Sequence, residues 1–127
     1  MPKQVLVIDD DAAVRKAFEI AFRGSTYELS SVESGRRGID RVQDRHFDLI
    51  FLDLRMPGLD GVQTLREIRR LGFEAPIYIV TSFHEEFLGP LSALARDGIE
   101  FEVLSKPVAP EQLIQIAESA LEGRILH

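Results

Sequence analysis

The chain has no cysteine among its 127 residues. This absence excludes a disulfide framework, a thiolate metal site and a cysteine nucleophile. Long apolar runs are missing too, because the first one, Val5 to Ile8, is far too short for a signal-peptide core or a membrane span. We therefore expect a soluble cytoplasmic protein with no membrane partner.

Positive charge is also scarce, with 15 Lys and Arg against 21 Asp and Glu and a net charge of −6. Adjacent arginines occur only at Arg36-Arg37 and Arg69-Arg70. Because nucleic-acid binding depends on clustered Lys and Arg that displace counterions, we expect no direct binding of nucleic acid. The composition, 45% hydrophobic and 28% charged, is that of a globular chain.

Short apolar runs alternate with segments of helical period, and no linker rich in Ser, Gly or Pro divides them, so residues 1–127 should form one domain. The expected strands are Gln4 to Ile8, Tyr27 to Val32, Leu49 to Asp53, Ile77 to Val80 and Glu100 to Ser105. The expected helices are Val14 to Phe22, Ser34 to Asp44, Asp60 to Leu71, Glu85 to Asp97 and Leu113 to Leu121. Gly89-Pro90 disfavours a continuous fourth helix, although one starting at Pro90 is tolerated.

Continuous apolar runs such as Leu49 to Leu52 are typical of strands buried on both faces of a parallel sheet. Five strands alternating with five helices predict an α/β doubly wound five-stranded parallel sheet. In such sheets the functional groups gather at the carboxyl ends of the strands.

Polar side chains follow four of the expected strands, and they should converge at one edge of the sheet: Asp9, Asp10 and Asp11, then Asp53, then Thr81, then Lys106. Grouped carboxylates repel each other unless a cation neutralises them. Oxygen ligands without nearby His or Cys favour Mg²⁺, with Mn²⁺ as the alternative.

A carboxylate, a hard divalent cation and a lysine are the inventory of phosphoryl transfer to an aspartate. Asp53 is the best nucleophile, because it stands alone after the central strand. The turn that follows it, beginning at Arg55, can bring a backbone carbonyl to the metal. We expect Asp10 to be a direct metal ligand.

The motifs VLVIDDDAAVR, DLIFLDLRMPGLDG, IVTS and LSKP, in this order along the chain, resemble the receiver domain of two-component response regulators. The resemblance covers the whole chain and implies a chemotaxis-regulator-like fold with the flavodoxin-like strand order 2-1-3-4-5. It implies a signalling protein that is not an enzyme. It implies that Asp53 receives a phosphoryl group from a phosphohistidine of a sensor histidine kinase or phosphotransfer protein. It also implies that Asp9, Asp10, Asp53 and the Arg55 carbonyl hold Mg²⁺, and that Lys106 contacts a phosphoryl oxygen.

The resemblance further implies that Thr81 moves its hydroxyl onto the phosphoryl group, which switches the surface of the fourth helix, fifth strand and fifth helix for a partner. The family usually has Tyr or Phe where this chain has Val103, and Phe101, two residues earlier on the same side of the strand, is an imperfect substitute. Arg55 and Phe83 should flank the phosphoryl group. The output is a downstream protein partner or an output domain absent from this sequence, with a phosphorylation-dependent dimer as a further expectation.

Plainer roles are expected for other residues. Asp11 should cap the first helix, Pro107 should follow a cis peptide bond as the family often shows, and the three histidines should be surface residues. Two other functions stay open. A haloacid-dehalogenase-type phosphatase would use Asp9 as its nucleophile, and a pseudo-receiver would signal by binding without phosphorylation.

Overall fold

The computed structural model describes residues 2–82 and 85–123. Within them five parallel strands form one sheet in the order β2-β1-β3-β4-β5, which confirms the predicted doubly wound α/β fold. The strands are β1 (Gln4–Ile8), β2 (Glu28–Val32), β3 (Leu49–Leu52), β4 (Ile77–Thr81) and β5 (Glu102–Ser105). The helices are α1 (Ala12–Phe22), α2 (Gly35–Asp44), α3 (Gly61–Arg70), the 3₁₀ turn η1 (Glu85–Phe87), α4 (Leu88–Arg96) and α5 (Pro110–Glu122).

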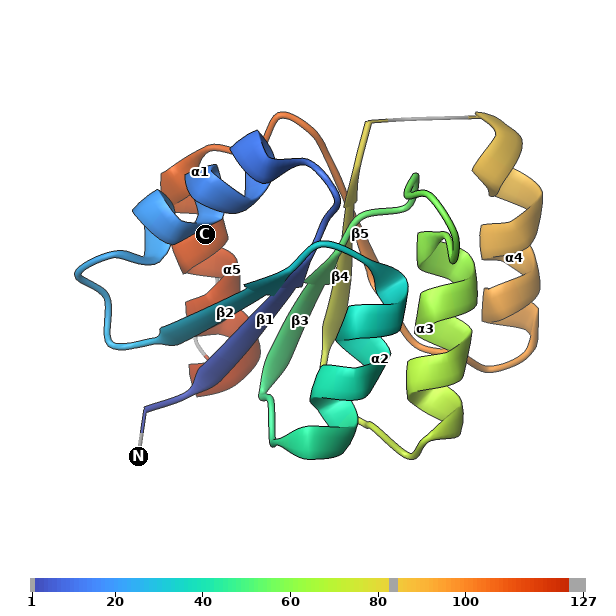
Figure 1. Cartoon of the computed structure of the whole chain (residues 1–127), viewed down its shortest axis with the longest axis horizontal. Helices are drawn as coiled ribbons and strands as arrows, with labels where there is room; N and C mark the ends of the chain where they lie inside the picture. The colour runs from blue at the N-terminus through green and yellow to red at the C-terminus, as the bar shows by residue number, and fades with distance from the viewer. Residues whose placement is uncertain (1, 83–84, 124–127) are drawn as a thin grey trace.

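Helices cover both faces of the sheet, α1 and α5 on one side and α2, α3 and α4 on the other (Figure 1). This two-sided arrangement follows from the sequence because successive side chains of a strand point to opposite faces of the sheet. In β1, Leu6 and Ile8 enter the core under α2, α3 and α4, whereas Val5 and Val7 enter the core under α1 and α5. The runs Val5–Ile8 and Leu49–Leu52 are therefore apolar at every position, and each contributes side chains to both cores.

Several predicted boundaries are wrong. α1 begins at Ala12 instead of Val14, and α5 begins at Pro110 instead of Leu113. The helix expected over Glu85 to Asp97 is divided into η1 and α4, and α4 begins at Leu88, so that Pro90 lies in its first turn where a missing N–H is tolerated. The fifth strand begins at Glu102 instead of Glu100, because residues 98–101 form the connection that enters it.

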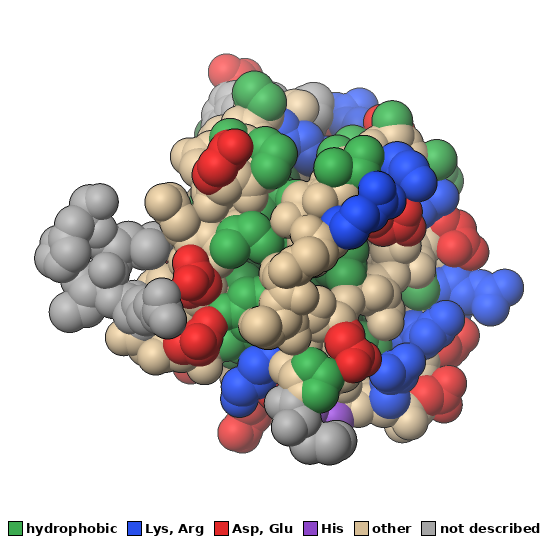
Figure 2. Space-filling model, turned by 90° about the vertical axis from the view of Figure 1, so that its left-hand side faces the viewer, with side chains coloured by type: hydrophobic (Ala, Val, Ile, Leu, Met, Phe, Trp, Pro, Cys, Tyr) green, Lys and Arg blue, Asp and Glu red, His purple; other side chains and the backbone are tan. Residues whose placement is uncertain are grey.

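Charged side chains of both signs are interspersed over the face that carries α1 and α5 (Figure 2). No helix among the described residues is long and apolar enough to cross a membrane.

Candidate phosphoacceptor site

The register of the sheet brings Asp9 and Asp53 together. Ile8 is paired with Leu52 in neighbouring parallel strands, and each aspartate is the next residue in its chain segment. The Asp53 N–H donates to the Ile8 carbonyl at 2.9 Å, and the Asp9 N–H donates to the Val32 carbonyl at 3.1 Å. The backbone of both acids is therefore held by the sheet.

Three carboxylates and one lysine converge at this edge. Oxygens of Asp9, Asp10 and Asp53 all lie within 4.8 Å of one another. Lys106 donates from Nζ to Asp9 Oδ2 at 3.2 Å and to Asp53 Oδ1 at 3.3 Å. Asp9 and Asp53 are buried, whereas Asp10 is exposed. Four of the predicted site residues therefore lie together, with a solvent-facing side where a cation can enter.

Burial raises the pKa of the Asp53 carboxyl from 3.8 to about 6, and repulsion from Asp9 and Asp10 adds to the increase while Lys106 opposes it. Burial would lower the pKa of Lys106, but the charges of Asp53 and Asp9 outweigh burial and raise it. The site thus holds more negative charge than one lysine neutralises, which is the electrostatic condition for binding a divalent cation.

The other two predicted site residues occupy the same edge in different ways. Thr81 is buried at the last position of β4, and its Oγ1 donates to the Ser82 carbonyl at 2.8 Å. The Lys106 N–H donates to the Thr81 carbonyl at 2.8 Å, so these two residues are fixed to each other through the backbone. Arg55 follows Asp53 by two residues, its side chain is exposed, and it forms an ion pair with Glu86 of η1.

A glycine sets the approach of α3 to Asp53. A Cβ placed on Gly61 would lie 2.3 Å from the Asp53 carbonyl oxygen and 2.7 Å from Leu54 Cα. Gly61 follows the helix cap Asp60, whose side chain accepts a hydrogen bond from the Gln63 N–H at 2.8 Å. The Gly61 N–H donates to the Leu54 carbonyl at 2.8 Å. Only glycine allows the helix start to lie against the Asp53 backbone.

Val103 and Phe101 differ in surroundings. Val103 is 47% exposed on the edge strand β5, while Phe101 precedes the strand and packs partly buried against the core under α2, α3 and α4. The position where the family usually has an aromatic ring is therefore a solvent-facing aliphatic side chain in this chain.

Asp11 caps α1, where its Oδ1 accepts from the Ala13 N–H at 2.8 Å, and the Lys106-Pro107 peptide bond is cis, both as predicted. His46 is exposed and lies 2.7 Å from Asp48 Oδ1. Phe83, His84 and His127 lie outside the described residues.

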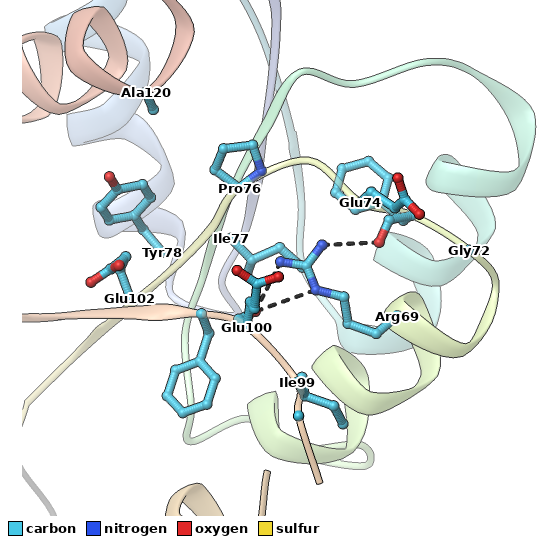
Figure 3. A pocket seen from close by; sticks show the side chains of 13 residues that line it. Arg69, Gly72, Glu74, Pro76, Ile77, Tyr78, Ile99, Glu100, Glu102 and Ala120 are labelled. Carbon is cyan, nitrogen blue, oxygen red and sulfur yellow. Dashed lines mark hydrogen bonds between the residues drawn. The ribbon is translucent and has the colours of Figure 1, made fainter. Parts of the chain in front are cut away.

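An open pocket at the other end of the strands does not belong to this site (Figure 3). Arg69 lies within it and donates to the Phe73 and Ala75 carbonyls at 2.9 and 2.7 Å, and to the Glu100 carbonyl at 2.9 Å. Its guanidinium joins the segment before β4 to the segment before β5, which is a structural role.

Three residues near the site were not identified from the sequence. Gly61 lies in the motif DLRMPGLDG, where a glycine directly after a helix cap signals a close backbone approach. Arg15 donates from Nη1 to the Asp9 carbonyl at 2.7 Å, and Glu86 pairs with Arg55. No sequence spacing identifies the last two, because their contacts depend on how α1 and η1 are placed.

Residues 5–118 match the family model described as the response regulator receiver domain. The chain belongs to the response regulator receiver family. Among curated receiver-containing relatives, response regulator MprA of Mycolicibacterium vanbaalenii is 35% identical over 90% of this chain and 48% of that protein. Transcriptional regulatory protein ZraR of Escherichia coli O157:H7 is 32% identical over 92% of this chain and 26% of that protein. The receiver chain thus spans less than half the length of both relatives.

Solved receiver structures have the same fold. A CheY-like receiver domain protein from Methanospirillum hungatei JF-1 superposes with a TM-score of 0.85 at 21% identity, covering 97% of this chain and 96% of that one. Chemotaxis protein CheY4 of Vibrio cholerae superposes with a TM-score of 0.82 at 24% identity, covering 95% of this chain and all of that one. At these identities the likeness establishes the fold.

Proposed function

We propose that residues 1–127 form one receiver domain that works in the cytoplasm as a phosphoacceptor, with Asp53 as the nucleophile. The observation that carries this proposal is the placement of a buried Asp53 carboxylate against Lys106 at 3.3 Å, beside Asp9 and an exposed Asp10. Family membership supports it, since receiver domains are signalling modules and not typical enzymes.

In the proposed reaction a carboxylate oxygen of Asp53 attacks the phosphorus of a phosphohistidine on a sensor histidine kinase or phosphotransfer protein. The new O–P bond forms as the P–N bond breaks, and the imidazole leaves with the electron pair of that bond and takes up a proton. Lys106 lies where its ammonium group can neutralise a phosphoryl oxygen. Thr81, at the end of the neighbouring strand, would turn its hydroxyl from the Ser82 carbonyl toward the phosphoryl group.

The donor set fits Mg²⁺, with Mn²⁺ as the alternative hard cation. Asp9, Asp10 and Asp53 offer oxygen ligands within 4.8 Å of one another, and the Arg55 carbonyl is the fourth proposed protein ligand. When bound, the ion would neutralise charge on the transferring oxygens. Asp9 and Asp53 are already oriented by backbone hydrogen bonds, so the chain supplies a prearranged site.

The downstream step would use the surface of α4, β5 and α5, through which a partner protein, an output domain or a second copy reads the phosphorylated state. ZraR is named as a transcriptional regulatory protein, and this chain spans 26% of its length. An output domain on a longer protein is therefore one form of this proposal, and a separate partner protein is the other.

The proposal is tested with acetyl phosphate and Mg²⁺ on the whole chain. We expect an intact-mass increase of one phosphoryl group that is stable in acid and lost in base. Asp53→Asn should abolish it, and omission of Mg²⁺ should slow it. Label mapped to Asp9 would support the dehalogenase-type phosphatase instead, and no label on the wild-type chain would support a pseudo-receiver.

A further inference from the structure

The ion pair between Arg55 and Glu86 joins the two loops that leave the site. Arg55 follows Asp53 by two residues, and Glu86 lies in η1, which precedes α4. Both side chains are more than half exposed, at 60% and 56% of their full area. A change of charge at Asp53 is therefore only two residues away from a contact that reaches the start of α4.

The η1–α4 segment is held in the core by few buried side chains, Phe87 of η1 and Leu94 of α4, so an ion pair at its exposed start adds to what holds it. Within α4 the only fully buried side chain is Leu94, whereas α3 buries five residues along a similar length. Leu88, the first residue of α4, is 51% exposed.

Two arginine–carboxylate pairs link this segment to the α3 side of the molecule, one near each end. Arg55 binds Glu86 at the start, and Arg66 of α3 donates to Asp97 Oδ2 at 2.9 Å at the end of α4. The two pairs have the same chemistry and comparable exposure. Only the first involves a residue beside Asp53, which makes the second a matched control.

We propose that the Arg55–Glu86 pair couples phosphorylation of Asp53 to the start of α4. An acyl phosphate replaces one carboxylate charge with about two negative charges and three strong acceptors, and a guanidinium prefers such a group to a single carboxylate. Arg55 would leave Glu86 for the phosphoryl group. The η1 turn and the first turn of α4 would then lose the ion pair that links them to the loop after Asp53. This inference rests on the proposed phosphoacceptor function.

The structure also limits the competing route through β5. Val103, at 47% exposure, carries neither a ring nor a hydrogen-bonding group that could follow a movement of Thr81. Phe101 lies outside the strand and is packed against the core. A coupling through charged side chains at η1 needs neither residue.

Amide hydrogen exchange of the full chain, with and without acetyl phosphate and Mg²⁺, tests the coupling. In the unphosphorylated state Glu86→Gln and Arg55→Gln should each speed exchange over residues 85–91 by about two- to fivefold, the range for an exposed ion pair. Wild-type protein should show the same increase when phosphorylated, and phosphorylation should add little in the two variants.

Arg66→Gln and Asp97→Asn are the matched controls. They should speed exchange near residue 97 and leave the response of residues 85–91 to phosphorylation unchanged. Glu86→Gln should also increase the rate of phosphorylation by acetyl phosphate, because Arg55 is then free for the incoming phosphoryl group. That increase in rate should vanish in the Arg55→Gln/Glu86→Gln double variant. The Arg55→Lys/Glu86→Gln double variant should recover part of the increase, because lysine keeps the positive charge.

The outcomes separate this inference from the function on which it rests. If Asp53 is phosphorylated but exchange over residues 85–91 does not change, the coupling is wrong and the phosphoacceptor function stands. If Glu86→Gln exchanges like wild type before phosphorylation, the pair does not hold η1 and the inference is overturned. If no phosphoryl group reaches Asp53, both proposals fall.

Discussion

The backbone of Asp53 is fixed from two directions. Its N–H is bound to the Ile8 carbonyl in the sheet, and its carbonyl lies under the first residue of α3, Gly61. The side chain therefore projects from a segment that has little freedom to move. This rigidity serves a nucleophile, because phosphoryl transfer depends on position more than on covalent chemistry supplied by the protein.

Gly61→Ala tests this constraint. The added Cβ would meet backbone atoms of Asp53 and Leu54 at 2.3 and 2.7 Å, and backbone cannot move aside cheaply. We expect the free energy of unfolding to fall by about 2–3 kcal/mol, as for overpacked sites. Phosphorylation of Asp53 should also slow, because the displaced residue carries the nucleophile. Denaturant unfolding and intact-mass kinetics measure the two effects.

Gly38→Ala is the control for that substitution. Its Cβ would meet Ile8 Cδ1 at 2.3 Å and Ile8 Cγ1 at 2.9 Å, which are side-chain atoms and can shift more easily than the backbone atoms that face Gly61. Alanine also has the higher helix propensity, so we expect a net change within about 1 kcal/mol. Phosphorylation kinetics should be unchanged. Equal losses in the two variants would contradict the proposed role of the Gly61 contact.

At the scale of elements, α4 has one fully buried side chain, that of Leu94. Leu94 is fully buried under the helix, whereas Leu88, six residues earlier on the same helix, is 51% exposed. Leu91 of α4 also packs against the core, but its side chain is only partly buried. The helix next to the site is thus held by less apolar surface than α3.

Leu94→Ala should therefore lower the free energy of unfolding by about 2–4 kcal/mol, the cost of a buried leucine and its cavity. Leu88→Ala should change the free energy of unfolding by no more than about 0.5 kcal/mol, because Leu88 is 51% exposed in the folded state. Guanidinium unfolding of both variants measures the contrast. A Leu88 effect as large as that of Leu94 would mean that the start of α4 is buried by a contact beyond those described.

The predicted fold was correct where the sequence carried a strong local signal. Short apolar runs such as Val5 to Ile8 favour strands buried on both faces. The carboxyl ends of parallel strands lie at one edge of the sheet, which brings Asp9, Asp53 and Lys106 together. The division of Glu85 to Asp97 was not predicted, since Gly89-Pro90 weakened the helical pattern without marking where it breaks.

Contacts that depend on the placement of whole elements were beyond sequence reasoning. The pairing of Arg55 with Glu86 requires η1, a 3₁₀ turn with no periodic signal. Because β5 begins at Glu102, Phe101 lies outside the strand. The prediction that Phe101 and Val103 lie on the same side of one strand is therefore wrong. Local pattern specifies which residues are buried, but it does not specify how a short connection turns.

At the scale of the whole molecule, the site costs stability. Burial holds the pKa of Asp53 at about 6, against 3.8 for a free carboxyl, so between these values the folded state binds a proton that the unfolded state has lost. The contribution of Asp53 to stability therefore falls as pH rises from about 4 through 6, and the loss is complete near about pH 7. About two pKa units correspond to at most about 3 kcal/mol, which Mg²⁺ would offset by binding the folded state alone.

Asp53→Asn removes this cost, and Lys106 keeps Asp9 as its partner at 3.2 Å. In EDTA at pH 7 we expect the variant to be more stable than wild type by about 1–3 kcal/mol. The difference should disappear near about pH 3, where the wild-type carboxyl is protonated in the folded state and mostly protonated in the unfolded state. Saturating Mg²⁺ should stabilise wild type more than the variant and so narrow the gap at pH 7. Urea unfolding at several pH values, with and without Mg²⁺, measures these differences, and a variant less stable than wild type at pH 7 in EDTA would show that the Lys106 contact outweighs the burial of Asp53.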